Sequence, residues 1–189
     1  RQFYVDKTHF IAEWVYRDAK VTLITRPRRF GKTLNMSMLQ YFLSIKEKDN
    51  AYLFNGLNIT KNQEIMKYQN KYPVIFMTFK DMKNNTFNRQ LSVFSILIRD
   101  LIDTNQELLS SCQISEFNKE ILKEYYQGVE DEIKLQNALK FICTCMKQHY
   151  DQKVIILIDE YDVPLQSAYL HNYYDEMTNF MGGVLSSVL

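Results

Sequence analysis

The sequence is poor in glycine and proline, the residues that most often interrupt regular secondary structure. Among 189 residues there are only five glycines and three prolines, so few positions favour tight turns or helix breaks. No internal repeat or low-complexity tract is present. The sequence therefore predicts a chain in which helices dominate.

Cysteine is also scarce, and its number is odd. The three cysteines, Cys112, Cys143 and Cys145, do not suit a disulfide framework and are typical of a reducing, cytoplasmic compartment. Cys143, Cys145 and His149 could be read as metal ligands, but the Cys-x-Cys spacing is not the usual one. Apolar residues recur at helical spacing over 135–146, which favours small hydrophobic residues on a helix.

Long apolar runs and a strong net charge are missing as well. The longest aliphatic run is Val154–Ile158, far short of the roughly 20 residues that cross a membrane, so no membrane partner is expected. The net charge of +1 gives no global attraction to nucleic acid. The chain begins with Arg and ends within an apolar-periodic segment, so both ends are expected to be cut and the chain to be the N-terminal part of a longer protein, truncated at its C-terminus.

Three short apolar runs predict β-strands at 21–25, 73–79 and 153–159, and the second is expected to be buried on both faces. Helical periodicity predicts helices over 8–18, 31–45, 87–103, 115–127, 130–149 and 165–188. In the second helix, Leu34, Met38, Phe42 and Ile45 share the apolar face. Strands joined by helical crossovers predict an α/β domain over 1–189, with a parallel sheet covered by helices on both faces.

The segment Thr25–Thr33, with the sequence TRPRRFGKT, follows the first predicted strand and leads into a helix. Gly31 lets a backbone approach phosphate closely, Lys32 can reach the β and γ phosphates, and the Thr33 hydroxyl can bind Mg²⁺. This order of residue types is typical of a nucleotide-binding loop. The alternative is a basic loop with a good helix start.

The first half of this loop departs from the usual glycine-rich pattern. Arg26 stands where glycine is expected, and Pro27 has no amide hydrogen to donate. Arg28 and Arg29 could compensate through charge-assisted contacts, or they could face a partner instead. The residues expected to contact a nucleotide are Arg28, Arg29, Phe30, Gly31, Lys32, Thr33 and Leu34.

Two carboxylates, Asp159 and Glu160, follow the strongest predicted strand. In parallel sheets ligands bind at the carboxyl ends of the strands, where the loop is also expected. Asp159 could bind Mg²⁺, and Glu160 could orient or deprotonate an attacking water. The alternative is an ordinary polar strand end.

Two further polar motifs have both a structural and a functional interpretation. Asp162 precedes Val163 and Pro164, so it is expected to cap a helix; otherwise it could hold an arginine of the loop. The segment Asp6–Thr8 precedes the first helix, where capping is again the default. It could alternatively lie beside an adenine base.

Three segments together resemble the predicted AAA-ATPase-like family of bacteria. They are Phe3–Thr8, Arg26–Thr33 and Leu157–Leu165, and the resemblance covers essentially the whole chain. It implies a P-loop NTPase fold with Arg26–Thr33 as a variant Walker A motif and Val154–Glu160 as Walker B. It also implies a further central strand, beyond Leu189, and an attached nuclease-like domain through which nucleic acid could be the target.

The resemblance implies an ATPase that uses ATP and Mg²⁺. Lys32 and Glu160 match the catalytic positions, and Thr33 and Asp159 match the metal-binding ones. Two alternatives stay open: a nucleotide-sensing module that regulates the nuclease-like domain without useful hydrolysis, and a small-molecule or nucleotide kinase. A homo-oligomer is possible.

Overall fold

The structure is a computed structural model that describes residues 5–24 and 31–188. The chain divides into two compact units, residues 1–76 and residues 77–189. The boundary falls inside strand β1 (Val74–Thr78), which pairs with β2 (Ile155–Asp159) in a two-stranded parallel sheet. The expectation of a single domain over 1–189 stays a prediction, because two compact units can belong to one domain.

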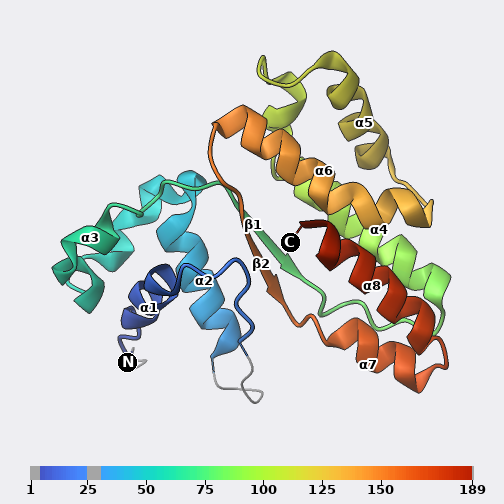
Figure 1. Cartoon of the computed structure of the whole chain (residues 1–189), viewed down its shortest axis with the longest axis horizontal. Helices are drawn as coiled ribbons and strands as arrows, with labels where there is room; N and C mark the ends of the chain where they lie inside the picture. The colour runs from blue at the N-terminus through green and yellow to red at the C-terminus, as the bar shows by residue number, and fades with distance from the viewer. Residues whose placement is uncertain (1–4, 25–30, 189) are drawn as a thin grey trace. The chain divides into compact units, whose positions relative to one another are not determined.

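Helices dominate, as the sequence predicts, and they make up 65% of the structure. The first unit contains helices α1 (His9–Arg17), α2 (Lys32–Leu43), η1 (Ile45–Phe54), η2 (Asn58–Lys61) and α3 (Gln63–Met66). The second contains α4 (Phe87–Asp103), η3 (Gln106–Ser110), α5 (Glu116–Gln127), α6 (Glu132–Tyr150), α7 (Val163–Leu170) and α8 (Tyr174–Val188). Figure 1 labels the α-helices and strands along the chain.

Helix α2 is held in the first unit by contacts at its C-terminal end. The amide of Asn70 donates to the Phe42 carbonyl (2.7 Å), and its side-chain amide donates to the Ser44 carbonyl (2.7 Å). The Phe42 ring meets Phe54 of η1 edge to face, with centroids 5.1 Å apart. The last carbonyls of α2 therefore have partners, and the helix that begins at Lys32 is fixed from its far end.

The face that α2 buries agrees with the expected one only at Phe42. The structure buries Met36, Leu39, Phe42 and Leu43, whereas Leu34 is exposed. Apolar residues occur all round this helix, so spacing alone does not select the inward face. The second strand differs in a similar way, because Ile75 and Met77 are buried while the alternate positions of β1 are only half-buried. The prediction that this strand is buried on both faces is wrong.

The first predicted strand is also wrong over its described part. Residues 21–24 have no regular secondary structure, and Val21 and Leu23 are exposed; Thr25 lies outside the described residues. β-branched residues favour an extended chain, but a strand exists only where a neighbouring strand completes its hydrogen bonds.

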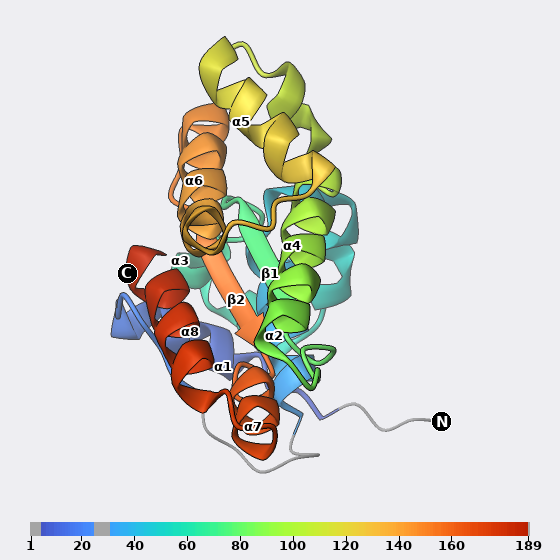
Figure 2. The ribbon, with the colours of Figure 1, turned by 90° about the vertical axis from the view of Figure 1, so that its right-hand side faces the viewer.

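In the second unit, α6 packs against both α4 and α8 (Figures 1 and 2). The interior contains a chain of aromatic rings in which Phe94 of α4 lies between Phe79 and Phe180. The Phe94 and Phe180 centroids are 5.2 Å apart, with the rings nearly perpendicular, a favoured aromatic geometry.

The predicted helix over 165–188 is two helices, α7 and α8, rather than one. Between them Asn172 adopts a left-handed conformation (φ 61°), and the Tyr173 amide donates to the Ala168 carbonyl. The Tyr173 hydroxyl donates to the Asn84 carbonyl, which also accepts a hydrogen bond from the Ser167 hydroxyl (3.0 Å). These tertiary bonds turn Tyr173 inward (it is almost fully buried) and break the helix.

Candidate functional site

The predicted nucleotide loop is described from Gly31 onward, and Arg26, Pro27, Arg28, Arg29 and Phe30 lie outside the described residues. Gly31 has φ 75° and ψ 27°, in the left-handed region that glycine adopts without steric cost. A Cβ added at Gly31 would meet nothing within 4 Å. The backbone conformation, and not lack of space, is therefore what favours glycine here.

Helix α2 begins directly after this glycine, at Lys32, and the Gly31 carbonyl accepts the Asn35 amide at 2.9 Å. Among the described residues, no side chain caps this helix start and its first turn contains no acidic residue. The first amides of a helix point outward at its positive end. Lys32 is half-buried there, while Thr33 and Leu34 are exposed, so a cationic side chain and a hydroxyl flank this positive end.

Asp159 ends strand β2 in the second unit, and only 5% of its surface is exposed. Its carbonyl accepts the Phe79 amide (3.0 Å), which fixes the end of the strand. Its side-chain Oδ1 accepts the amide of Glu160 at 3.0 Å. The backbone amide of the next residue thus helps to orient the buried carboxylate.

Glu160 has φ 55°, which is unusual for a residue with a side chain. Its carbonyl accepts the Val163 amide (3.1 Å) in the turn that leads into α7, and the residue is half-buried. Non-glycine residues in the left-handed region cost roughly 1–2 kcal/mol and occur often at functional sites. The turn therefore keeps a carboxylate at a position where glycine would be less strained.

The structure places the predicted site residues in two groups. Gly31, Lys32, Thr33 and Leu34 lie at the start of α2 in the first unit, and Asp159 and Glu160 lie at the end of β2 in the second. Each group is contiguous in sequence, so its members are neighbours.

Asp162 occupies the N-cap position of α7 but makes no side-chain capping bond there. Its Oδ2 instead accepts a hydrogen bond from the Gln166 side chain at 2.6 Å. The expected cap is therefore wrong, because the carboxylate is engaged one helical turn further along.

Asp6 and Thr8 link the start of the chain to η2 and do not cap α1. The Asp6 Oδ2 accepts the Asn58 amide (2.7 Å), and the Thr8 hydroxyl accepts the Ile59 amide (3.1 Å). Burial opposes the charged form of Asp6, but hydrogen bonds from Asn58 and Thr8 outweigh it and lower the pKa below its ordinary value of 3.8. The motif has a structural role in the first unit.

Cys143 and Cys145 lie on helix α6 and behave as hydrophobic residues of that helix, as the sequence favours, whereas Cys112 is exposed in a turn. Burial raises the pKa of Cys143 to about 12 and that of Cys145 to about 11, which disfavours the thiolates that bind metals. His149 Nδ1 lies 2.8 Å from the Ser111 hydroxyl, a pairing that no sequence spacing signals. Within residues 5–24 and 31–188, no three His, Cys, Asp or Glu residues are grouped to hold a metal ion.

Across the described part of the chain, no helix combines the length and apolar character needed to cross a membrane.

Comparison with known proteins supports the resemblance drawn from the sequence motifs. The family model described as "Predicted AAA-ATPase" matches residues 1–188. No match to the chain was found among curated proteins or solved structures.

Proposed function

The chain belongs to the predicted AAA-ATPase family, and we propose that it binds ATP and hydrolyses it with Mg²⁺. The observation that supports this most strongly is the start of α2. There Gly31 is left-handed and helix α2 begins with Lys32 directly after it. A helix N-terminus with a flanking lysine suits the phosphates of a nucleotide.

In this proposal the nucleotide phosphates bind to the backbone amides around Gly31 and to the Lys32 ammonium. Arg28, Arg29, Phe30 and Leu34 are assigned to the same binding role from the sequence. The fold class that goes with this role is a P-loop NTPase. The helix-rich α/β structure with its parallel strand pair is compatible with it.

Thr33 and Asp159 are proposed to hold Mg²⁺, which favours hard oxygen ligands such as a hydroxyl and a carboxylate. In nucleotide sites Mg²⁺ usually takes one or two protein ligands and completes its shell with phosphates and water. A cluster of three acidic or histidine ligands is thus not required. The bound ion would neutralise charge on the phosphates, and Thr33 and Asp159 would position it.

Glu160 is proposed to orient and deprotonate the attacking water. Its strained φ of 55° and its place directly after the buried Asp159 support this role. A carboxylate is a suitable acceptor for the proton of a water, and strained residues are often kept where function needs them.

The test is ATP binding and phosphate release by the purified chain and two variants. Glu160→Gln keeps the size of the side chain but removes the base, so turnover should be lost while binding persists. Lys32→Ala should weaken binding. Equal turnover by Glu160→Gln and the unchanged chain would overturn the catalytic assignment. Binding without turnover by the unchanged chain would favour a nucleotide-sensing role.

A further inference from the structure

Helix α7 has apolar side chains on both its inward and its outward face. The inward residues Val163, Pro164, Ser167 and Ala168 are buried. The outward face includes Leu165 and Gln166, and it continues to Tyr169 and Leu170, which are 73% and 74% exposed. A helix that already has an inward face does not need large apolar residues on the other side, so the outward face calls for a separate explanation.

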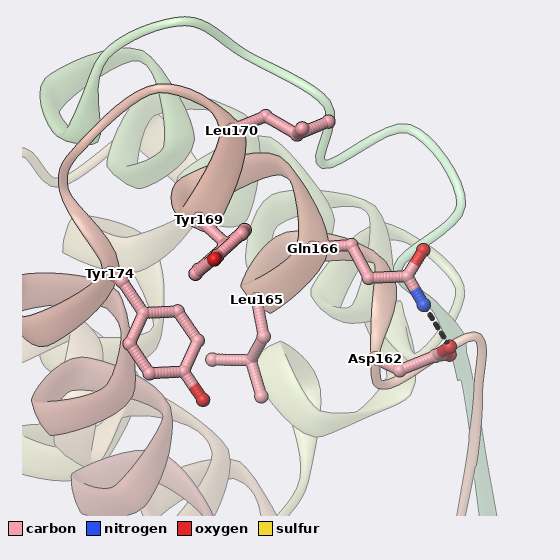
Figure 3. Close-up of a pocket in the computed structure, with 6 residues that line it drawn as sticks. All are labelled: Asp162, Leu165, Gln166, Tyr169, Leu170 and Tyr174. Atoms are coloured by element: carbon pink, nitrogen blue, oxygen red, sulfur yellow. Dashed lines mark hydrogen bonds between the residues drawn. The ribbon is translucent and has the colours of Figure 1, made fainter.

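The outward face borders a hollow of about 680 Å³ (Figure 3). Its lining, called the α7 patch below, consists of Asp162, Leu165, Gln166, Tyr169, Leu170 and Tyr174. Leu165, Tyr169 and Tyr174 point toward one another in the close-up, whereas Asp162 and Gln166 lie at the other end and are hydrogen-bonded. Exposed apolar surface with a polar edge is typical of a protein interaction site, and tyrosine is enriched in such sites.

The ring geometry and the charge of the α7 patch disfavour nucleic acid as its ligand. The Tyr169 and Tyr174 rings are perpendicular, with centroids 6.1 Å apart, so a flat base cannot stack between them. Residues 154–189 contain five Asp or Glu and no Lys or Arg, whereas phosphate backbones bind to cationic surfaces. Asp162 lies within the patch, and Asp175 and Glu176 follow Tyr174. The partner should therefore be positively charged and should offer apolar side chains.

The first unit of the chain carries a net charge of that sign. Residues 1–76 contain 13 Lys or Arg and 6 Asp or Glu. Residues 77–189 contain 10 Lys or Arg and 16 Asp or Glu. The small net charge of the chain thus combines a first unit of net +7 with a second of net −6. The first unit also exposes large apolar residues, among them Tyr16, Leu34 and Tyr52.

We propose that the α7 patch is a docking site for the positively charged first unit of a second copy of this chain. Opposite charges favour this head-to-tail contact, and apolar side chains can bury the Tyr169 and Leu170 surface. Contact between two α7 patches would bring like charges together and is disfavoured. The contact is heterologous, so further copies can add at the free ends. This inference does not depend on ATP binding or hydrolysis.

Sedimentation velocity tests the proposal, with the protein between about 1 µM and about 100 µM. The unchanged chain should associate with rising concentration, and raising the salt from about 0.05 M to about 0.5 M should weaken association because the Debye length shortens. The double variant Tyr169→Ser/Leu170→Ser should associate about tenfold or more weakly. Phe117→Ser is the matched control, because Phe117 on α5 is likewise 74% exposed but lies outside the patch.

Mixing separates a head-to-tail contact from a patch-to-patch one. The double variant keeps its basic first unit, so it should bind to the patch of an unchanged copy more tightly than it associates with itself. The side chain of Glu176 is exposed, so Glu176→Gln removes one negative charge without disturbing the apolar surface. This variant should weaken association at low salt only. Circular dichroism identifies any variant that fails to fold.

Three results would overturn the proposal. The first is an unchanged chain that stays monomeric over the whole range of protein concentration, even if a foreign basic peptide binds to the α7 patch. The second is an equal loss of association in Phe117→Ser and the double variant. The third is a double variant that is not incorporated when mixed with the unchanged chain.

Discussion

The backbone amide of Glu160 donates a hydrogen bond to the carboxylate of Asp159, with 3.0 Å between N and Oδ1. The same residue has a positive φ of 55°. Two acidic residues are therefore joined by a turn in which the first is buried and oriented, and the second is strained. The strained conformation lowers the stability of the fold and at the same time fixes the position of the Glu160 side chain.

Replacing Glu160 with glycine should relieve the strain that replacement with alanine retains. We expect Glu160→Gly to be more stable than Glu160→Ala by about 1 kcal/mol, because only glycine adopts positive φ without steric cost. Denaturant unfolding measures the difference. Both variants should lack ATP turnover if the proposed role is correct. A Glu160→Gly variant less stable than Glu160→Ala would show that the conformation carries no strain.

The Asp6 carboxylate should make the stability of the first unit depend on pH. Its folded pKa is lowered, so its contribution is fully present above the ordinary value of 3.8 and is lost as the pH falls through the lower folded pKa. Asp6→Asn should remove this dependence. It should also weaken protection of the Asn58 amide from hydrogen exchange, because that amide donates to Asp6.

Nuclear magnetic resonance measures this protection, and the Asn70 amide, which donates to Phe42 instead, is the internal control. An unchanged protection factor for Asn58 in Asp6→Ala, which unlike Asp6→Asn leaves no side-chain oxygen to accept the amide, would contradict the assignment.

The Asn84 carbonyl accepts hydrogen bonds from both Ser167 and Tyr173, so these donors should be thermodynamically coupled. Either Ser167→Ala or Tyr173→Phe alone leaves the carbonyl with one of the two donors, and each should cost about 1 kcal/mol. The double variant removes both donors, so its loss of stability should exceed the sum of the losses in the two single variants. Denaturant unfolding of the four proteins gives the coupling energy. Additive losses would mean that the two donors act independently.

Two adjacent glycines in α8 should respond differently to alanine. A Cβ at Gly182 meets nothing within 4 Å, so Gly182→Ala should stabilise the helix by about 0.5–1 kcal/mol. A Cβ at Gly183 would lie 2.9 Å from Cδ of Gln136, so that side chain must move and the gain should be smaller. Thermal unfolding compares the two, and a larger gain for Gly183→Ala would contradict the close α6–α8 packing.

Sequence pattern predicted the elements whose periodicity is strong and whose ends carry clear signals. Helix α4 has the predicted bounds, and Thr86 caps it by accepting the Arg89 amide. The strands around Ile75 and Leu157 were found from their apolar runs. The short helices η1, η2, α3 and η3 were missed, because four- to ten-residue turns with mixed polarity leave no periodic signal.

The remaining errors arise where tertiary partners decide the structure. No property of Val21–Ile24 reveals whether a neighbouring strand exists, and the break before Tyr173 depends on the distant Asn84. For the candidate site, the types and order of residues were readable from sequence. The left-handed conformation of Glu160 was not, because glutamate gives no signal for positive φ.

The hydrogen bonds from Asn58 to Asp6 and from Ile59 to Thr8 join positions 52 and 51 residues apart. Everything between them, including the helix that begins at Lys32, forms one long loop closed by the first residues of the chain. The entropic cost of closing such a loop grows only slowly with its length, and the hydrogen bonds made by Asp6 and Thr8 help to offset it. Any shortened version intended to keep the first unit intact should therefore start at or before Asp6.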